Sequence, residues 1–186
     1  MLYLPGWSFG GVVAHEMAVE LRRRGLVVQG ILLIDSPNPA AARRPLSEPL
    51  IDAVVNSERL DGRNASSGDS RLRKLVKDQF RINSQLLGEY RPESCGSGDP
   101  VVFLRSKEGF NPSSVMDIPG WLKDRRDDSG EMISEWESIA GVRVRVIDIP
   151  GNHFQAFDAS NVRCLFLFSF FGVLGFDADD VVWCLW

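Results

Sequence analysis

A Gly-x-Ser-x-Gly motif at residues 6–10 constrains what this chain can fold into more than any other feature. The apolar residues 2–5 before it predict a short strand, and a helical pattern begins directly after it. Gly6 and Gly10 flank Ser8 at positions where a Cβ atom would collide with the neighbouring strand or helix. A strand, a tight turn and a helix in this order have the form of a nucleophile elbow, which lifts a serine hydroxyl clear of the sheet. The alternative is a glycine-rich turn before an ordinary helix.

The helix expected after the motif covers residues 10–24. Its apolar residues recur at the spacing of one buried face, namely Val13, Met17 and Leu21, with Ala14 and Ala18 beside them. Three arginines followed by Gly25 are typical of a helix end, because basic side chains and a C-cap glycine both favour that terminus.

Three stretches after this helix predict further strands, the first of them with a continuous apolar run at residues 30–34. They cover residues 27–34, 100–105 and 142–149. Strands that alternate with helical or mixed crossovers indicate a mostly parallel α/β sheet that extends onward from the motif strand. Trp121 and Trp136 are expected to anchor the polar stretch between the last two strands to the body of the domain.

Residues 38–97 differ from the rest of the chain because they contain helical patterns but no predicted strand. Two helical patterns, at residues 47–60 and 70–87, are separated by the polar residues 61–69. Neither pattern alternates with a strand, so the stretch predicts a helical lid inserted into the α/β sheet.

Length and composition favour one globular domain. With 186 residues, 44% of them apolar, the chain can bury a sizeable core. A net charge of −4 gives no reason to expect a nucleic acid or an anionic membrane as partner. Cys95, Cys164 and Cys184 are widely spaced and lack metal-ligand spacing, so they predict reduced thiols and no metal site. No secretory signal is visible, and a cytoplasmic location is expected.

The tail at residues 163–186 is expected to lie outside the domain, which then covers residues 1–162. The apolar run at residues 164–176 has no helical amphipathicity and is shorter than the roughly 20 residues that span a bilayer. A transmembrane segment is therefore the lesser alternative. The abrupt change in composition favours translated intron or shifted-frame sequence.

A serine nucleophile such as Ser8 needs a nearby base, and the sequence contains only two histidines. His15 lies seven residues further along the same helix, about 10 Å away along its axis, and cannot reach the hydroxyl of Ser8. It is expected to be a structural or partly exposed residue. His153 follows a predicted strand, where parallel sheets present catalytic groups, and is the candidate base. The alternative for His153 is a turn residue packed by Phe154.

The partner of this base is expected at the same edge of the sheet. Asp35 ends the strand that follows the elbow helix, so it shares that edge with Ser8, and its alternative role is to cap the turn. Asp148 lies within a strand and points to a face. Glu108, after the third strand, is the nearest alternative acid. With Asp35, the order is serine, aspartate, histidine, which is the chain order of α/β-hydrolases.

Three separated motifs resemble one family, the C-terminal thioesterase domains of fungal polyketide synthases and related synthetase-like megasynthases. They are GWSFGGVVAHE at residues 6–16, LIDSP at residues 33–37 and PGNHF at residues 150–154. The resemblance covers about residues 2–162 and implies a partial α/β-hydrolase fold. It also favours Asp35 over Glu108, because the acid of this family follows the strand directly after the nucleophile helix.

The resemblance implies transfer of an acyl or polyketide chain from a phosphopantetheine thioester onto Ser8, as part of secondary metabolite biosynthesis. His153 would take the proton of Ser8, Asp35 would orient His153, and the backbone N–H of Phe9 would donate to the oxyanion. The implied partners are an acyl carrier protein domain and a small-molecule substrate, with no bound cofactor. Side chains that could line an apolar acyl pocket, or equally pack in the core, are Trp7, Leu86, Leu87 and Tyr90.

The chain also departs from this family. Family members have several strands before the elbow, including a loop that supplies a second oxyanion donor, and a helix after the histidine. We therefore expect a fragment truncated at both ends, with the elbow strand at an edge of the sheet. Losing one oxyanion donor typically costs on the order of 10²–10³ in rate. The alternatives are a free-standing acyl hydrolase or esterase, and an inactive remnant. Hydrolysis and cyclisation would use the same three residues.

Overall fold

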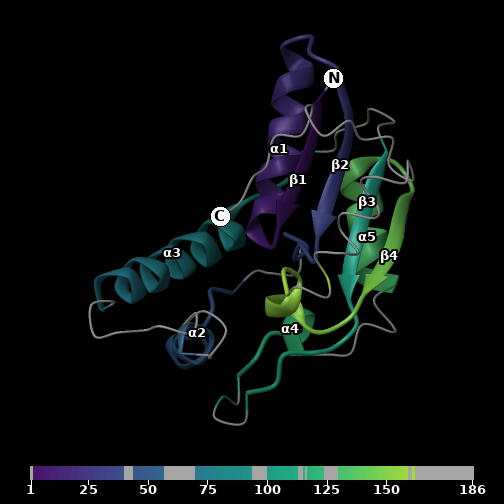
Figure 1. Cartoon of the computed structure of the whole chain (residues 1–186). Helices are drawn as coiled ribbons and strands as arrows, with labels where there is room; N and C mark the ends of the chain where they lie inside the picture. Colours follow the sequence, from purple (N-terminus) through teal and green to yellow (C-terminus); the bar gives the residue numbers. More distant parts are fainter. Residues whose placement is uncertain are drawn as a thin grey trace.

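The computed structural model of the chain describes residues 2–39, 44–56, 70–93, 100–112, 115, 117–123, 130–158 and 161. The described elements follow one another along the chain (Figure 1). They are β1 (Leu2–Trp7), α1 (Phe9–Arg23), β2 (Val28–Ile34), α2 (Glu48–Val55), α3 (Ser70–Glu89), β3 (Val101–Ser106), α4 (Gly120–Lys123), α5 (Gly130–Ala140), β4 (Val144–Ile149) and a short 3-10 helix (His153–Gln155).

The four strands form one sheet in the order β1-β2-β3-β4, and every neighbouring pair is parallel, as predicted. Trp7 pairs with Ile34 at the ends of β1 and β2, and Ile34 pairs with Leu104 two residues before the end of β3. Ser106 pairs with Ile149 at the ends of β3 and β4. The carboxyl ends of all four strands therefore meet at one edge. In Figure 1, α2 and α4 lie beyond that edge.

One face of the sheet carries the larger core, which α1 and α5 cover together. Its buried residues are Leu4, Val12, Ala14, Ala18, Val28, Ile31, Leu33, Leu87, Val101, Phe103, Trp136, Ala140 and Val144. The other face carries a smaller cluster made by Leu32, Ile34, Val102, Leu104, Ile149 and Ala156. Apolar burial on both faces explains the continuous apolar runs in β2 and β3, whereas β4, at the edge of the sheet, carries the charged Arg145 and Asp148.

The buried face of α1 is centred on the small residues of the predicted face. Ala14 and Ala18 are fully buried, whereas Val13, Met17 and Leu21 are only partly buried. Small side chains let the helix axis approach the sheet closely, and the larger ones are turned to the side. The predicted face is therefore the one that packs on the sheet, with its alanines in the main core and with Met17 and Leu21 packed against that core.

The lid contains the two predicted helices with altered ends. α2 stops at Val55, and residues 57–60 of its predicted range lie outside the described residues; α3 runs two residues beyond its predicted end. The guanidinium of Arg81 on α3 donates from Nε and Nη2 to the two carboxylate oxygens of Glu48 on α2, at 2.6 and 2.7 Å. This bidentate hydrogen bond holds the pKa of Glu48 below its usual value. It links the two lid helices at the protein surface.

The stretch after β3, predicted only to be polar, contains two helices that the sequence analysis did not predict, α4 and α5. Trp136, predicted as an anchor, lies on α5 in the main core, and its indole N–H donates to the carbonyl of Ser36 at 3.3 Å. The signal for α5 was the helical spacing of its apolar residues, which are Met132, Ile133, Trp136, Ile139 and Ala140.

The predicted tail, residues 163–186, lies outside the described residues. Within the described part of the chain, no helix has both the length and the apolar character needed to cross a membrane.

Candidate functional site

Ser8 occupies the tight turn between β1 and α1 and adopts a strained backbone conformation, with φ 53° and ψ −126°. Its N–H donates to the carbonyl of Ile34 at 2.9 Å, which extends the β1–β2 pairing into the turn. A Cβ atom on Gly6 would lie 2.1 Å from the carbonyl oxygen of Gly10. The turn can therefore form only because residue 6 is a glycine.

The first turn of α1 also packs tightly against the end of β2. A Cβ atom on Gly11 would lie 1.8 Å from Oγ of Ser36. That hydroxyl donates back to the carbonyl of Gly6 at 3.3 Å. These contacts fix the elbow against the neighbouring strand.

Asp35 directly follows β2 and has no exposed surface. It also has a positive φ of 47°, which is uncommon for a residue other than glycine. Its Oδ1 accepts a hydrogen bond from the backbone N–H of Ser106 at 3.0 Å, and its Oδ2 lies 2.9 Å from Nδ1 of His153. Both carboxylate oxygens are therefore engaged, which fixes the orientation of the group.

His153 begins the 3-10 helix after β4 and is 2% exposed. Asn152 caps this helix: its side chain accepts from the N–H of Phe154, and the side chain of Gln155 accepts from the N–H of Asn152. The amide nitrogen of Asn161 donates to the carbonyls of Pro150 and Gln155. The segment that carries the imidazole is thus tied together by its own side chains.

The structure brings Ser8, Asp35 and His153 into one hydrogen-bonded chain. Nε2 of His153 lies 2.9 Å from Oγ of Ser8. Because an ionised carboxylate only accepts hydrogen bonds, Asp35 favours the tautomer with the proton on Nδ1. Nε2 is then free to accept the proton of the hydroxyl. This arrangement is chemically able to activate a serine as a nucleophile.

The two other acids considered lie elsewhere. Asp148 accepts a hydrogen bond from Nε of Arg105 at 2.6 Å and pairs with Lys107, and the hydrogen bond from Arg105 lowers the pKa of Asp148. Glu108 is exposed, and its backbone N–H donates to the carbonyl of Gly151. Neither residue is the carboxylate bonded to the imidazole.

His15 lies inside the main core and not partly at the surface. It is 2% exposed and makes an edge contact with the ring of Trp136 at 5.9 Å between ring centroids. Neither of its ring nitrogens has a hydrogen-bond partner among the described residues. Burial lowers the pKa of His15 below its ordinary value.

A cavity of about 250 Å³ opens at Ser8 and His153, between the sheet edge and the lid. Its wall is mainly apolar, and its buried lining side chains include Val54, Leu87 and Leu122. Trp7 and Leu87, both predicted to line a pocket, line this cavity. Phe9, whose N–H was predicted to face an oxyanion, is the first residue of α1 and also lies in the wall.

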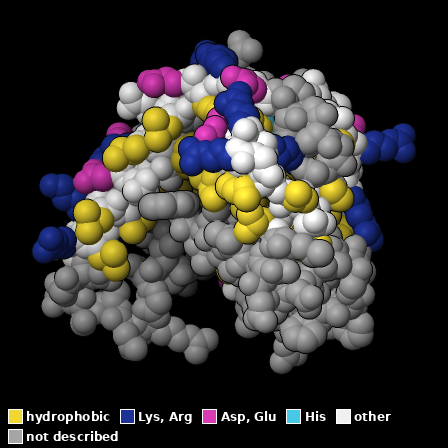
Figure 2. Space-filling view, turned by 90° about the horizontal axis from the view of Figure 1, so that it is seen from above, with side chains coloured by type: hydrophobic (Ala, Val, Ile, Leu, Met, Phe, Trp, Pro, Cys, Tyr) yellow, Lys and Arg dark blue, Asp and Glu magenta, His cyan; other side chains and the backbone are white. Residues whose placement is uncertain are grey.

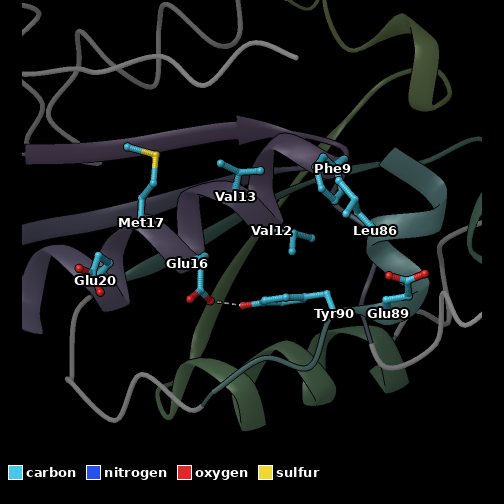
Figure 3. A pocket seen from close by; sticks show the side chains of 9 residues that line it. All are labelled: Phe9, Val12, Val13, Glu16, Met17, Glu20, Leu86, Glu89 and Tyr90. Carbon is cyan, nitrogen blue, oxygen red and sulfur yellow. Dashed lines mark hydrogen bonds between the residues drawn. The ribbon is translucent and has the colours of Figure 1, made fainter. Parts of the chain in front are cut away.

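Leu86 and Tyr90 do not line this cavity, contrary to the prediction. They line a second, more open hollow of about 610 Å³ between α1 and the end of α3 (Figure 3). There the hydroxyl of Tyr90 donates to the carboxylate of Glu16.

Figure 2 shows that exposed hydrophobic side chains also gather along α3, where Leu72, Leu75 and Ile82 are about half exposed. Among the described residues, no group of three potential ligands is arranged to hold a metal ion.

Comparison with known proteins identifies the family. Residues 2–166 match the family described as Thioesterase domain. Orsellinic acid synthase of Beauveria bassiana (strain ARSEF 2860) is 39% identical over 192 residues, covering 87% of this chain and 8% of that protein. Orsellinic acid synthase ArmB of Armillaria ostoyae is 33% identical over 159 residues, covering 82% of this chain and 7% of that protein. The chain thus spans less than a tenth of the length of these relatives.

Solved structures share the fold. The surfactin thioesterase domain SrfTE superposes with a TM-score of 0.59 at 20% identity, covering 95% of this chain and 69% of that one. Human thioesterase 2 superposes with a TM-score of 0.59 at 14% identity, and the match covers 95% of this chain and 75% of that one. These likenesses confirm the predicted fold, a partial α/β-hydrolase with a mostly parallel sheet and a helical lid. The predicted resemblance to fungal polyketide synthase thioesterases is also confirmed, and the chain belongs to the thioesterase domain family.

Proposed function

We propose that this chain is a serine thioesterase that releases an acyl or polyketide chain from a phosphopantetheine carrier through an acyl-serine intermediate. One observation carries the proposal: Asp35, His153 and Ser8 are hydrogen-bonded in series at the mouth of an apolar cavity. Membership of the thioesterase domain family supports the choice of reaction.

The reaction begins as Oγ of Ser8 attacks the thioester carbonyl and Nε2 of His153 accepts its proton. Asp35 holds the imidazole in position and stabilises its positive charge. The backbone N–H of Phe9, at the start of α1, donates to the oxyanion. The C–S bond then breaks, the proton passes from the imidazolium to the departing thiolate, and the acyl group remains on Ser8. Water, or a nucleophile within the chain itself, attacks the ester in the second half by the same route.

The cavity indicates what the acyl group is like. Its volume of about 250 Å³ and its mainly apolar wall suit a compact acyl group better than a long, extended one. Two relatives are named as orsellinic acid synthases, and we propose a compact polyketide as the natural substrate. An acyl carrier protein domain would present that substrate, in the cytoplasm, without any resident cofactor.

A fluorophosphonate probe tests the nucleophile. We expect the probe to label the folded chain at Ser8 and to label Ser8→Ala not at all, with the modified peptide identified by mass spectrometry. Ser84 lines the same cavity, so Ser84→Ala is the matched control and should label like the wild type. His153→Ala should lower the labelling rate by about 10³-fold or more, because the hydroxyl loses its base.

Hydrolysis of acyl-pantetheine thioesters tests the reaction itself. A higher kcat/KM for these thioesters than for simple oxygen esters is expected of a thioesterase, and the reverse order would favour a general esterase. A folded chain that neither labels at Ser8 nor turns over either substrate would be an inactive remnant, and the proposal would be wrong.

A further inference from the structure

The sheet order creates a positioning problem for the proposed catalytic base. Ser8 follows β1 and His153 follows β4, and these two strands lie at opposite edges of the sheet with β2 and β3 between them. Neighbouring strands lie about 4.8 Å apart, so the imidazole must be carried roughly 14 Å across the strand ends to reach the hydroxyl. Contacts from each strand in turn are needed to hold it there.

Most hydrogen bonds of the segment after β4 join residues within that segment. They fix its local conformation but do not fix its position relative to the strands. The bonds of Asn152 and Asn161 all run within residues 150–161. Just after β3, the backbone N–H of Glu108 donates to the carbonyl of Gly151, and just after β2, Asp35 is hydrogen-bonded to the imidazole. From α4, the ring of Trp121 makes an edge contact with the imidazole at 5.3 Å between ring centroids, and β1 supplies the contacts on the other strand edge.

Trp7, the last residue of β1, makes these contacts through its ring and its N–H. Its ring stacks on the imidazole of His153, with centroids 5.1 Å apart and planes at 28°. Its indole N–H donates to the backbone carbonyl of the same histidine at 3.2 Å. The ring also makes edge contacts with Phe154 and Phe157, at 6.5 and 5.7 Å between centroids. One side chain thus contacts both the ring and the backbone of the base.

We propose that Trp7 is the positioning residue for the base in the reaction proposed above, on which this inference rests. Trp7 and Ser8 are consecutive, so a single stretch of backbone places both the nucleophile and the support of its base. The stacked indole face also meets a ring that becomes positively charged as the reaction proceeds, and aromatic faces attract cations. Because this attraction grows toward the transition state, it raises kcat more than it strengthens substrate binding.

Trp7 also lines the cavity, so a plain lining role is the competing explanation. A lining residue changes KM through contact with the acyl group, whereas a positioning residue changes the acylation rate with little effect on KM. Phe80 is the matched control, because it lines the same cavity from α3 and has no ring contact or hydrogen bond with His153.

The kinetic test compares Trp7→Leu, Trp7→Phe and Phe80→Leu on a short acyl-pantetheine thioester. Trp7→Leu loses both the stack and the N–H, and we expect kcat to fall about 30-fold with KM within about twofold of the wild type. Trp7→Phe keeps an aromatic face, and its kcat should fall only about fivefold. Phe80→Leu should change KM and leave kcat within about twofold.

A spectroscopic test reads the stack without any turnover. The chain has two histidines, so the ring protons of His153 can be assigned by comparison with His153→Gln. In the wild type these protons should be shifted upfield by the ring current of the stacked indole. Trp7→Leu should remove most of that shift, and Trp7→Phe should keep part of it. Because Trp7→Phe keeps an aromatic ring, it still tests the proposal if Trp7→Leu fails to fold.

The outcomes separate this inference from the proposed function. If the wild type turns over, Ser8→Ala does not, and Trp7→Leu keeps wild-type kcat or changes KM alone, Trp7 is only a lining residue and the inference is overturned. An unchanged His153 signal in Trp7→Leu overturns it as well. If the wild type neither labels nor turns over, the proposed function fails, whereas the loss of the upfield shift would still support the contact.

Discussion

At the scale of single residues, His15 shows how burial without a hydrogen-bond partner sets a protonation state. Its ring nitrogens have no partner among the described residues, and burial lowers its pKa below the ordinary 6.5. A charged imidazole there would lie in the main core against Trp136. His15 therefore remains neutral in the folded protein under conditions that protonate it in the unfolded chain.

His15 should make stability depend on pH. The unfolded chain takes up the proton near pH 6.5, and the folded chain only at lower pH, so stability is retained above pH 6.5 and lost as the pH falls below it. His15→Phe removes this contribution. The unfolding free energy of the wild type, measured by urea denaturation from pH 7.5 to 5, should fall faster than that of the variant, by up to about 1.4 kcal/mol per pH unit. Parallel curves would show that His15 keeps its ordinary pKa.

At the scale of elements, the elbow depends on how closely α1 approaches β2. A Cβ atom on Gly11 would overlap the hydroxyl of Ser36, which is itself bonded to the carbonyl of Gly6. Neither partner can move away without disturbing the turn that holds Ser8. The small side chains of α1 are therefore a requirement of the site as well as of the core.

Gly11→Ala should lower the unfolding free energy by about 1–3 kcal/mol, as overpacking does, and slow the labelling of Ser8. Gly130→Ala is the matched control, because Gly130 begins α5 and a Cβ atom there meets nothing within 4 Å. Its unfolding free energy should stay unchanged or rise by up to about 1 kcal/mol, since alanine is the better helix former. Similar losses in the two variants would contradict the close packing at the elbow.

At the scale of the whole molecule, the lid has a hydrophobic cluster separate from the cores of the sheet. Leu50 and Val54 of α2 pack with Val115 and Leu122, and Phe154, next to the proposed base, packs against the same cluster. Local opening of this cluster would loosen α2 and the segment that carries His153, whereas Leu87 of α3 is packed in the main core of the sheet.

Two matched substitutions distinguish the clusters. Leu50 in the lid and Leu33 in β2 are 0% and 1% exposed, so each change to alanine removes the same buried atoms. Leu50→Ala should speed hydrogen exchange in α2 and α3 and leave β2 and β3 protected. Leu33→Ala should lower global stability by about 2–5 kcal/mol and speed exchange throughout. If Leu50→Ala speeds exchange equally in the sheet, the lid and the sheet unfold as one unit.

Local sequence patterns were sufficient to predict most of the helices and strands. The elbow, the parallel strands and the two lid helices depend on contiguous residues, so their glycines and apolar spacings could be recognised in the sequence. The same holds for the positions of Ser8, Asp35 and His153 at strand ends. α5 was missed because its apolar residues lie within a largely polar stretch, where the helical spacing is easily overlooked.

The sequence by itself determined which elements form and which polar residues lie where parallel strands end, because both follow from neighbours along the chain. Only the tertiary structure decided which side chains meet. Leu86 and Leu87 are adjacent but point about 100° apart on α3, so one lines the outer hollow and the other the cavity at Ser8. Likewise, Trp7 meets His153 only because the segment after β4 crosses the ends of the strands between them. Contacts between residues this far apart depend on strand order and side-chain direction, which local patterns do not encode.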